Sequence, residues 1–139
     1  MSVKMNAEKL KQQAEQGNAE AQYDLGIWYH CQGTRIKQGY AKAKYWLEKS
    51  AKQGNSNAQF RLGISYRWGF PGFKRSYAKA AYWLEKPAEQ GDAGSQYELG
   101  EMYSCGNGVE QDNTKAKYWW EKAAKQGNKD AKKMLREKN

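Results

Sequence analysis

The sequence contains three copies of one segment, and this repetition constrains the fold more than any other feature. The first half of each copy reads GNAEAQYDLGIWY, GNSNAQFRLGISY or GDAGSQYELGEMY, and the copies begin 37 residues apart at Gly17, Gly54 and Gly91. The second half reads YAKAKYWLEKSAKQG, YAKAAYWLEKPAEQG or NTKAKYWWEKAAKQG. Units of this length predict one small structural element per repeat, stacked so that neighbouring units bury a shared core.

Each repeat is predicted to contain two helices, which we name helix A and helix B. Helix A opens on residue types that cap helix N-termini, and a fourth such residue recurs near the end of the sequence: Asn18, Asn55, Asp92 and Asn128. The glycine before each of them tolerates a left-handed backbone and ends the preceding helix. Apolar residues spaced by four then form one stripe along helix A, as in Ala21, Leu25 and Tyr29. Helix B begins near Gly39, Ser76 and Asp112.

A glycine also stands in the middle of every helix A, at Gly26, Gly63 and Gly100. Glycine inside a helix costs about 1 kcal/mol relative to alanine. Because this cost recurs at the same phase in three repeats, we predict that a neighbouring helix approaches too closely there for a side chain.

The chain is predicted to form a single all-helical repeat domain over residues 1–139. Residues 1–16 match the closing half of a helix B, with Leu10 and Ala14 in the places of Leu47 and Ala51. Residues 127–139 match the opening of a helix A and are expected to form a capping helix. Between these half-repeats lie repeat 1 (17–53), repeat 2 (54–90) and repeat 3 (91–126).

Three motifs resemble the Sel-one-like repeat family, a branch of the tetratricopeptide-like helical solenoids. They are A-x-Y-x-L-G-x-x-Y in helix A, the loop Gly106–Asp112 with the sequence GNGVEQD, and K-A-x-x-W-x-x-K-A-A-x-Q-G in helix B, and the match runs from Ala7 to Leu135. The resemblance implies a right-handed superhelical solenoid of antiparallel helix pairs, an α/α superhelix with a concave inner face. It also implies a non-catalytic module that binds other proteins, as an adaptor, a scaffold or an inhibitor or immunity-type binder.

The chain departs from this family pattern in its loops and its cysteines. The loops at 33–39 and 69–76 lack the Gly-x-Gly-Val of the third loop, and we expect Ile36 and Phe73 to fill the site that Val109 fills there. Some secreted members of the family carry paired cysteines within each repeat. That pattern is absent here, so properties tied to those members are not transferred.

By analogy with tetratricopeptide grooves, helix A would line the concave face and bind the partner. The candidates are Tyr23, Ile27 and His30 in repeat 1, Phe60, Ile64 and Arg67 in repeat 2, and Tyr97, Glu101 and Ser104 in repeat 3, with Trp68 as a rim anchor. Tyr23, Phe60 and Tyr97 could equally be core residues between repeats. Positions whose residues differ between repeats are better binding candidates, because stacking requires the same residue in every repeat and recognition does not. The residues of a further series on the helix flank also differ, namely Asp24, Arg61 and Glu98.

The charges of these candidates predict three zones along the concave face. It would be apolar at the N-terminal end, basic in the middle and acidic toward the C-terminal end. A partner peptide with an apolar anchor followed by acidic residues would complement the first two zones.

The formal net charge of +9 leaves a second class of partner open. Nucleic acid or an acidic surface could bind the lysine-rich helix B faces, through Lys42, Lys44, Lys49, Lys79, Lys86, Lys115, Lys117 and Lys122. The lysines alternate with alanine and glutamate and form no block of like charge, which favours their being solvated outer helix faces.

We can name no set of residues in the sequence that would catalyse a reaction, so we expect no enzyme, no catalytic residue and no cofactor. His30, the single histidine, and Cys31 are adjacent on a helix and therefore point about 100° apart, too far to act as a nucleophile and base. No spacing typical of metal ligands occurs. Cys31 and Cys105 stand two repeats apart, beyond disulfide reach, and free thiols suit a reducing compartment. With no signal-like apolar segment after Met1, we expect a cytoplasmic bacterial protein, monomeric or weakly dimeric.

Overall fold

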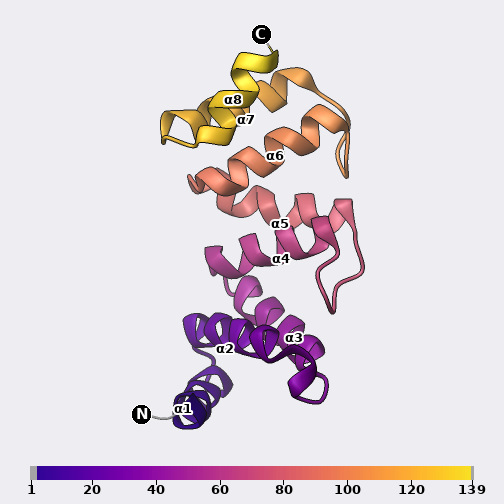
Figure 1. Ribbon diagram of the computed structural model, residues 1–139. Coiled ribbons are helices and arrows are strands. Elements are labelled where there is room, and N and C mark those ends of the chain that lie inside the picture. The colour runs from indigo at the N-terminus through magenta and orange to yellow at the C-terminus, as the bar shows by residue number, and fades with distance from the viewer. Residues whose placement is uncertain (1–2, 139) are drawn as a thin grey trace.

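The computed structural model describes residues 3–138, with side chains from Ala7 onward, and this part of the chain folds into eight α-helices and one short 3-10 helix (Figure 1). In chain order the helices are α1 (Val3–Glu15), α2 (Ala19–Gln32), the 3-10 helix η1 (Gly33–Arg35), α3 (Gly39–Lys52), α4 (Ser56–Trp68), α5 (Tyr77–Glu89), α6 (Ala93–Cys105), α7 (Asn113–Lys125) and α8 (Lys129–Lys138).

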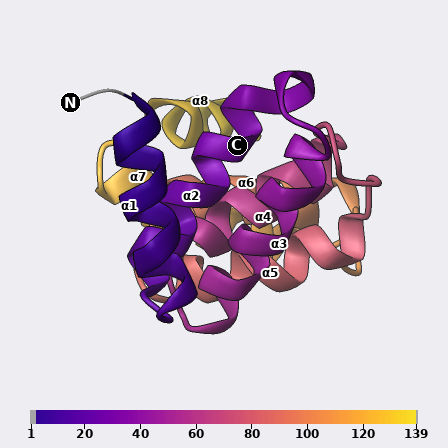
Figure 2. The same cartoon turned by 90° about the horizontal axis from the view of Figure 1, so that it is seen from below.

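The helices pack as antiparallel pairs in a single stack. The helix A elements are α2, α4 and α6, and each packs most extensively against the helix B element that follows it, which is α3, α5 or α7. Figure 1 shows the loops inside the pairs on one side of the stack and the turns between repeats on the other. Figure 2 shows that successive pairs are rotated relative to one another. With α1 and α8 as half-repeats at the two ends, the predicted all-helical solenoid is confirmed.

Side-chain caps begin every helix A as the sequence predicts. The side chains of Asn18, Asn55 and Asp92 accept hydrogen bonds of 2.8, 2.9 and 2.8 Å from backbone N–H groups three residues later. Asn128 caps α8 in the same way at 2.8 Å. The glycine before each cap has a φ between 94° and 103°, which a residue with a side chain adopts only under strain, so these four turns require glycine.

The mid-helix glycines mark the places where helix A and helix B approach most closely. A Cβ atom at Gly26 would lie 2.8 Å from Cγ of Leu47, and one at Gly63 would lie 2.5 Å from Cγ of Leu84. In repeat 3 the indole of Trp120 fills the same space against Gly100. The predicted close approach is therefore confirmed in all three repeats.

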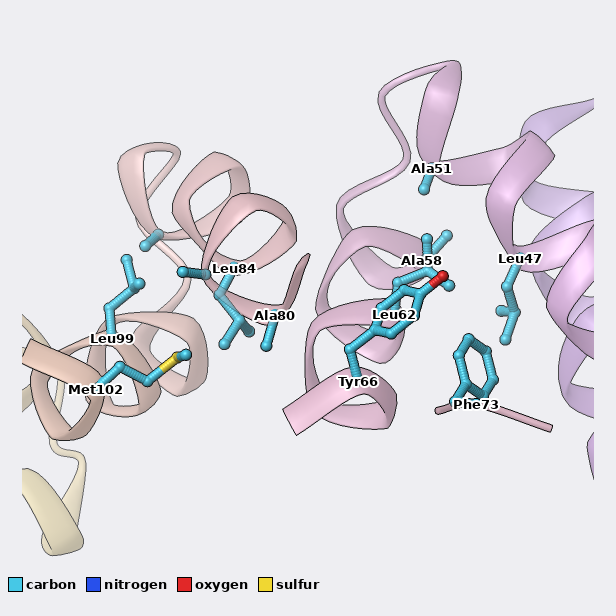
Figure 3. Packing of buried hydrophobic residues seen from close by; sticks show 12 residues of the cluster. Leu47, Ala51, Ala58, Leu62, Tyr66, Phe73, Ala80, Leu84, Leu99 and Met102 are labelled. Atoms are coloured by element: carbon cyan, nitrogen blue, oxygen red, sulfur yellow. The ribbon is translucent and has the colours of Figure 1, made fainter. Parts of the chain in front are cut away.

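The centre of the core is formed by the side chains of five buried leucines: Leu25, Leu47, Leu62, Leu84 and Leu99. Small residues such as Ala58 and Ala80 lie between them and let the helices approach. Figure 3 shows Tyr66 of α4 across from Phe73, and Leu84 and Ala80 on the side of Leu99 and Met102. Phe73 is 7% exposed, with its ring centroid 5.1 Å from that of Tyr66, and Ile36 and Val109 are partly buried against the core as well. The three loops thus each insert an apolar side chain, as predicted.

A glutamine in each helix A ties successive repeats together, and the sequence analysis did not assign it a role. The side-chain amides of Gln22, Gln59 and Gln96 donate hydrogen bonds of 3.0, 3.1 and 3.0 Å to the carbonyls of Ala14, Ala51 and Ala88 in the preceding helix. All three glutamines are buried. Their recurrence at one phase of the repeat is the signal that could have revealed them.

A second glutamine completes this network in repeats 1 and 3 but not in repeat 2. Gln53 donates to Gln22 Oε1 at 2.8 Å, and Gln126 donates to Gln96 Oε1 at 3.1 Å. In repeat 2 the side chain of Gln90 instead accepts a hydrogen bond of 2.6 Å from Ser56, and the buried Oε1 of Gln59 has no partner. Ala19 and Ala93 stand where Ser56 stands, so the hydroxyl of Ser56 is what diverts Gln90.

Candidate partner-binding surface

The ten predicted binding residues lie on α2, α4 and α6, and we call them together the helix A surface. Tyr23, Ile27, Phe60 and Ile64 are half-buried and pack against the central core, and Tyr97 packs against the C-terminal core. The three aromatic residues therefore serve as core between repeats while keeping part of each ring exposed. Trp68, in contrast, is 50% exposed.

Arg67 forms the main ionic contact on this surface. Its guanidinium binds the carboxylate of Glu98 and, at 2.9 Å, that of Glu101, so it joins α4 to α6 across the boundary between repeats 2 and 3. Glu101 also accepts a 2.7 Å hydrogen bond from the hydroxyl of Tyr97. Arg67 is only 5% exposed, so this cluster is largely removed from water.

The charges of this cluster alter the pKa values of its members. Burial alone would lower the pKa of Arg67, but the hydrogen bonds and charges of Glu101 and Glu98 raise it, so the guanidinium stays charged. Burial raises the pKa of Glu98, and the charge of Arg67 only partly offsets that rise. Burial and the hydrogen bond to Glu101 likewise raise the pKa of the Tyr97 hydroxyl.

The predicted basic zone in the middle of the helix A surface is wrong as far as it rests on Arg67. The charge of Arg67 is already paired with Glu98 and Glu101. Arg67 and the acidic end thus form one ion-paired cluster in which two carboxylates share one guanidinium. The physical reason is that side chains of adjacent helix A elements face each other, so residues 31 and 34 positions apart meet.

A second cationic place lies at the boundary between repeats 1 and 2. The ring of Phe70, directly after α4, has the imidazole of His30 at 6.5 Å and the guanidinium of Arg61 at 5.5 Å from its centroid. His30 also packs edge-on against Tyr40 at 5.6 Å. Burial and, to a lesser degree, the charge of Arg61 lower the pKa of His30. Arg61 was predicted on the helix flank, and the sequence carries no signal that brings Phe70 or Tyr40 to this place.

Trp68 lies at the end of α4 with its indole over the guanidinium of Arg67, 4.6 Å from the ring centroid. This stacking holds the exposed indole against the ionic cluster. The equivalent positions in repeats 1 and 3 are the exposed Cys31 and Cys105. Trp68 is therefore a single large apolar side chain without a counterpart in the other repeats.

The helix B lysines lie over aromatic rings. Lys49, Lys86 and Lys122 cover the rings of Tyr45, Tyr82 and Tyr118 at 5.2, 4.2 and 5.2 Å. Lys42, Lys79 and Lys115 lie over the rings of Tyr29, Tyr66 and Tyr103 at 5.6, 5.3 and 5.3 Å. Lys44 lies near the rings of both Tyr66 and Phe73. Lys117 instead lies 4.0 Å from the carboxylate of Glu121. Half of each of Tyr45, Tyr82 and Tyr118 is exposed, so the outer face carries a repeated tyrosine–lysine pair.

Two pockets lie toward the two ends of the molecule. One of about 550 Å³ lies between α6, α7 and α8 and is lined by residues that include Ser104, Trp120 and Leu135. Another of about 390 Å³ lies between α1 and α2, against Trp28 and Tyr29. Ser104 is the one residue of the helix A surface that lines either of these two pockets.

Within residues 3–138 no three His, Cys, Asp or Glu residues lie together in a way that could hold a metal ion. None of the helices described is both long and apolar enough to cross a membrane. Cys31 and Cys105 are exposed and form no disulfide in this part of the chain.

Three consecutive segments of the chain, residues 19–55, 56–92 and 93–128, match the Sel1 repeat. Each matched segment starts at the first residue of a helix A and runs to the cap of the next. Sel1 repeat proteins are non-catalytic scaffolds that bind other proteins. No curated protein sequence matches the chain significantly.

Among solved structures, a Sel1 repeat protein from Oxalobacter formigenes is 37% identical, with a TM-score of 0.83 over 95% of this chain and 98% of that one. A protective antigen of uropathogenic Escherichia coli strains, which displays an SLR fold, is 36% identical with a TM-score of 0.81. The matched region includes 90% of this chain but only 26% of the antigen. Cysteine-rich protein B of Helicobacter pylori, 24% identical, has a TM-score of 0.68 over 96% of this chain and 97% of that one, and shows the fold alone.

Proposed function

We propose that this chain, which belongs to the Sel1 repeat family, is a non-catalytic module that holds a partner protein through the helix A surface. Its partner would contact the half-buried side chains of α2 and α4 together with the exposed indole of Trp68. The role would be that of an adaptor, a scaffold or an inhibitor of one partner.

The observation that carries this proposal is a difference between neighbouring positions of helix A. Leu25, Leu62 and Leu99 are identical in the three repeats and fully buried, as stacking requires. Two positions later the residues are Ile27, Ile64 and Glu101, so repeat 3 differs from the other two, and all three side chains are half-buried. A surface that varies along an otherwise regular array is what recognition of one specific partner needs.

The experiment is affinity capture from nuclease-treated lysate with three forms of the protein. Trp68→Ala removes an aromatic side chain from the helix A surface, and Tyr82→Ala removes one that is similarly exposed on the outer face of α5. A partner held by the wild type and by Tyr82→Ala, but lost with Trp68→Ala, would support the proposal. A partner lost with Tyr82→Ala alone would move the binding face to helix B.

Trp68→Ala serves this purpose better than charge reversal at Arg67. Arg67 lies inside a buried ionic cluster, so its reversal would place three negative groups together and destabilise the fold itself. Trp68 is half exposed, so its truncation leaves the core leucines in place.

Binding of nucleic acid or an acidic surface to helix B stays the alternative, and the exposed tyrosine–lysine pairs favour it. Aromatic rings interleaved with cations are the elements that hold single-stranded nucleic acid. The change Lys49→Gln, Lys86→Gln and Lys122→Gln in one variant would weaken such binding and flatten its salt dependence. A labelled single-stranded RNA that shows no binding at about 0.15 M salt would exclude this alternative.

The two exposed thiols support a reducing compartment, and we extend the proposal to a cytoplasmic protein.

A further inference from the structure

The ionic cluster between repeats 2 and 3 has a counterpart one repeat earlier, and the two can be compared position by position. Arg67 meets Glu98, which follows it by 31 residues. One repeat earlier the residues in these two places are His30 and Arg61. The place where the later boundary holds the carboxylate of Glu98 thus holds the guanidinium of Arg61 at the earlier one.

His30 and Arg61 lie near one aromatic ring, that of Phe70. Burial and, to a lesser degree, the charge of Arg61 lower the pKa of His30, so the two groups are within electrostatic range of each other. Both side chains are half-buried, so each keeps an exposed part. Among the side chains described from Ala7 to Lys138, no Asp or Glu carboxylate forms an ion pair with either of them.

Apolar groups flank this cationic pair along the two helices. Ile27 precedes His30 by three residues on α2, and Ile64 follows Arg61 by three residues on α4. Residues three apart share a helix face, so each isoleucine lies one turn from the cationic group on its own helix. Both isoleucines are half-buried, which leaves apolar surface beside the charge.

We propose that His30 and Arg61 bind an acidic side chain of the partner protein, an Asp or Glu carried next to an apolar residue. This carboxylate would bind the guanidinium of Arg61, as Glu98 binds that of Arg67 at the following boundary, and its apolar neighbour would contact Ile27 and Ile64. The inference rests on the proposed function, because it names the chemistry that the helix A surface would recognise.

The chemistry of the pair suits a carboxylate. Arg61 offers a planar fork that can bind both oxygens of a carboxylate, and its guanidinium lies 5.5 Å from the centroid of the Phe70 ring. His30 can donate a second hydrogen bond when it is protonated. Arg67 shows that a guanidinium on this surface binds carboxylates, because its two terminal nitrogens each donate to a different glutamate.

The test uses a phage-displayed library of short random peptides, selected on the full chain in parallel with three variants. Arg61→Glu reverses the charge at the pair, and Ile64→Ala trims the apolar flank. Arg35→Gln removes an exposed arginine of η1 and is the matched control for charge loss. The wild type and Arg35→Gln should enrich peptides with an acidic residue beside an apolar one. Arg61→Glu should enrich lysine or arginine at that peptide position instead.

The strongest acidic peptide is then synthesised together with its Glu→Gln form, and both are titrated into the wild type and into Arg61→Gln. We expect about a tenfold loss of affinity for either change alone and little further loss for both together. The acidic peptide should also raise the pKa of His30, read from the proton signals of the only imidazole in the sequence. The Glu→Gln peptide should leave that pKa nearly unchanged.

The outcomes separate this inference from the proposed function. Peptides that bind, lose affinity with Ile64→Ala and show no acidic preference would overturn the inference and leave the proposed function standing. If acidic peptides bind equally well to Arg61→Glu but not to a Lys49→Gln, Lys86→Gln and Lys122→Gln variant, both are wrong and helix B is the binding face. A selection that yields no peptide above background on any form would also overturn the inference.

Discussion

Leu84 of α5 lies so close to the backbone of Gly63 in α4 that a Cβ atom on Gly63 would stand 2.5 Å from its Cγ. Real side chains do not approach to this distance, so the side chain of Leu84 or the helices themselves must shift if Gly63 acquires a methyl group. The same contact links Gly26 to Leu47 one repeat earlier.

Gly63→Ala should therefore destabilise the protein by about 1–3 kcal/mol, as overpacking of a core does, despite the higher helix propensity of alanine. The free energy of unfolding from urea titration measures this. Gly94→Ala is the control, because its added Cβ meets the edge of the Phe60 ring at 3.3 Å and Oδ2 of Asp92 at 3.6 Å, both looser contacts than that of Gly63. Equal or greater stability of Gly63→Ala would show that α4 and α5 are not held at this separation.

Arg67→Met should destabilise the protein by about 3 kcal/mol or more near neutral pH, because it leaves Glu98 and Glu101 facing each other without a cation. Lys117→Met is the matched control, since Lys117 lies 4.0 Å from Glu121 on the open surface and its loss should cost less than about 1 kcal/mol. A triple variant that also carries Glu98→Leu and Glu101→Leu should recover most of the lost stability. Similar losses for the two single variants would mean that the Arg67 cluster is effectively solvated.

Glu98 should make stability depend on pH in the opposite direction to an ordinary ion-paired carboxylate. Its pKa in the folded protein is raised above the usual 4.5, mainly by burial, so the folded state binds more protons than the unfolded state above pH 4.5. The stability from this group is present below pH 4.5 and is lost as the pH rises through the folded pKa. The free energy of unfolding of Glu98→Gln, relative to the wild type, should therefore improve as the pH rises through that window. A difference that does not vary with pH would place Glu98 in water.

His30 should titrate below the usual value of 6.5, because burial and Arg61 both disfavour its charged form. Since the unfolded chain takes up the proton first, stability from this residue is present above pH 6.5 and is lost as the pH falls through the folded pKa. The proton signals of the single imidazole give this pKa directly. Arg61→Gln should move it part of the way back toward 6.5, whereas Arg35→Gln should leave it in place. Equal shifts in the two variants would show only a general effect of net charge.

Ser56→Ala should stabilise the protein by up to about 1 kcal/mol, although it removes a hydrogen bond. Without the Ser56 hydroxyl, the amide of Gln90 is free to donate to the unpartnered Oε1 of Gln59, as Gln53 and Gln126 do in the other repeats. Thermal unfolding of Ser56→Ala beside Ser56→Ala with Gln90→Ala tests this, because the gain should disappear in the double variant. A gain that persists there would come from helix propensity alone.

Most of the fold could be predicted because the features that determine it are local and repeated. The caps at Asn18, Asn55 and Asp92, and the glycines opposite Leu47 and Leu84, can be recognised because each recurs at one phase of the repeat. Repetition also carries the glutamine network, whose residues recur as regularly as the caps, although their buried hydrogen bonds went unassigned.

The charges of the candidate surface could not be predicted in the same way. Whether Arg67 is a free cation or a buried partner of Glu98 depends on how adjacent repeats face each other, and that lateral register has no periodic signal in the sequence. His30 and Arg61 were therefore assigned to separate series, although Phe70 holds them together. Residues that differ between repeats carry the specificity of the surface, and each of them must be placed individually.

The stacking of the helices in chain order has a mechanical consequence. Within residues 3–138 the extensive helix packing is between elements that follow one another in the sequence, so the array has no common centre that must break before any part of it can move. A pull applied to the two ends would be shared among the boundaries between repeats, and each boundary would open by a small rotation. A partner that binds α2, α4 and α6 at once would oppose these rotations and so stiffen the whole molecule.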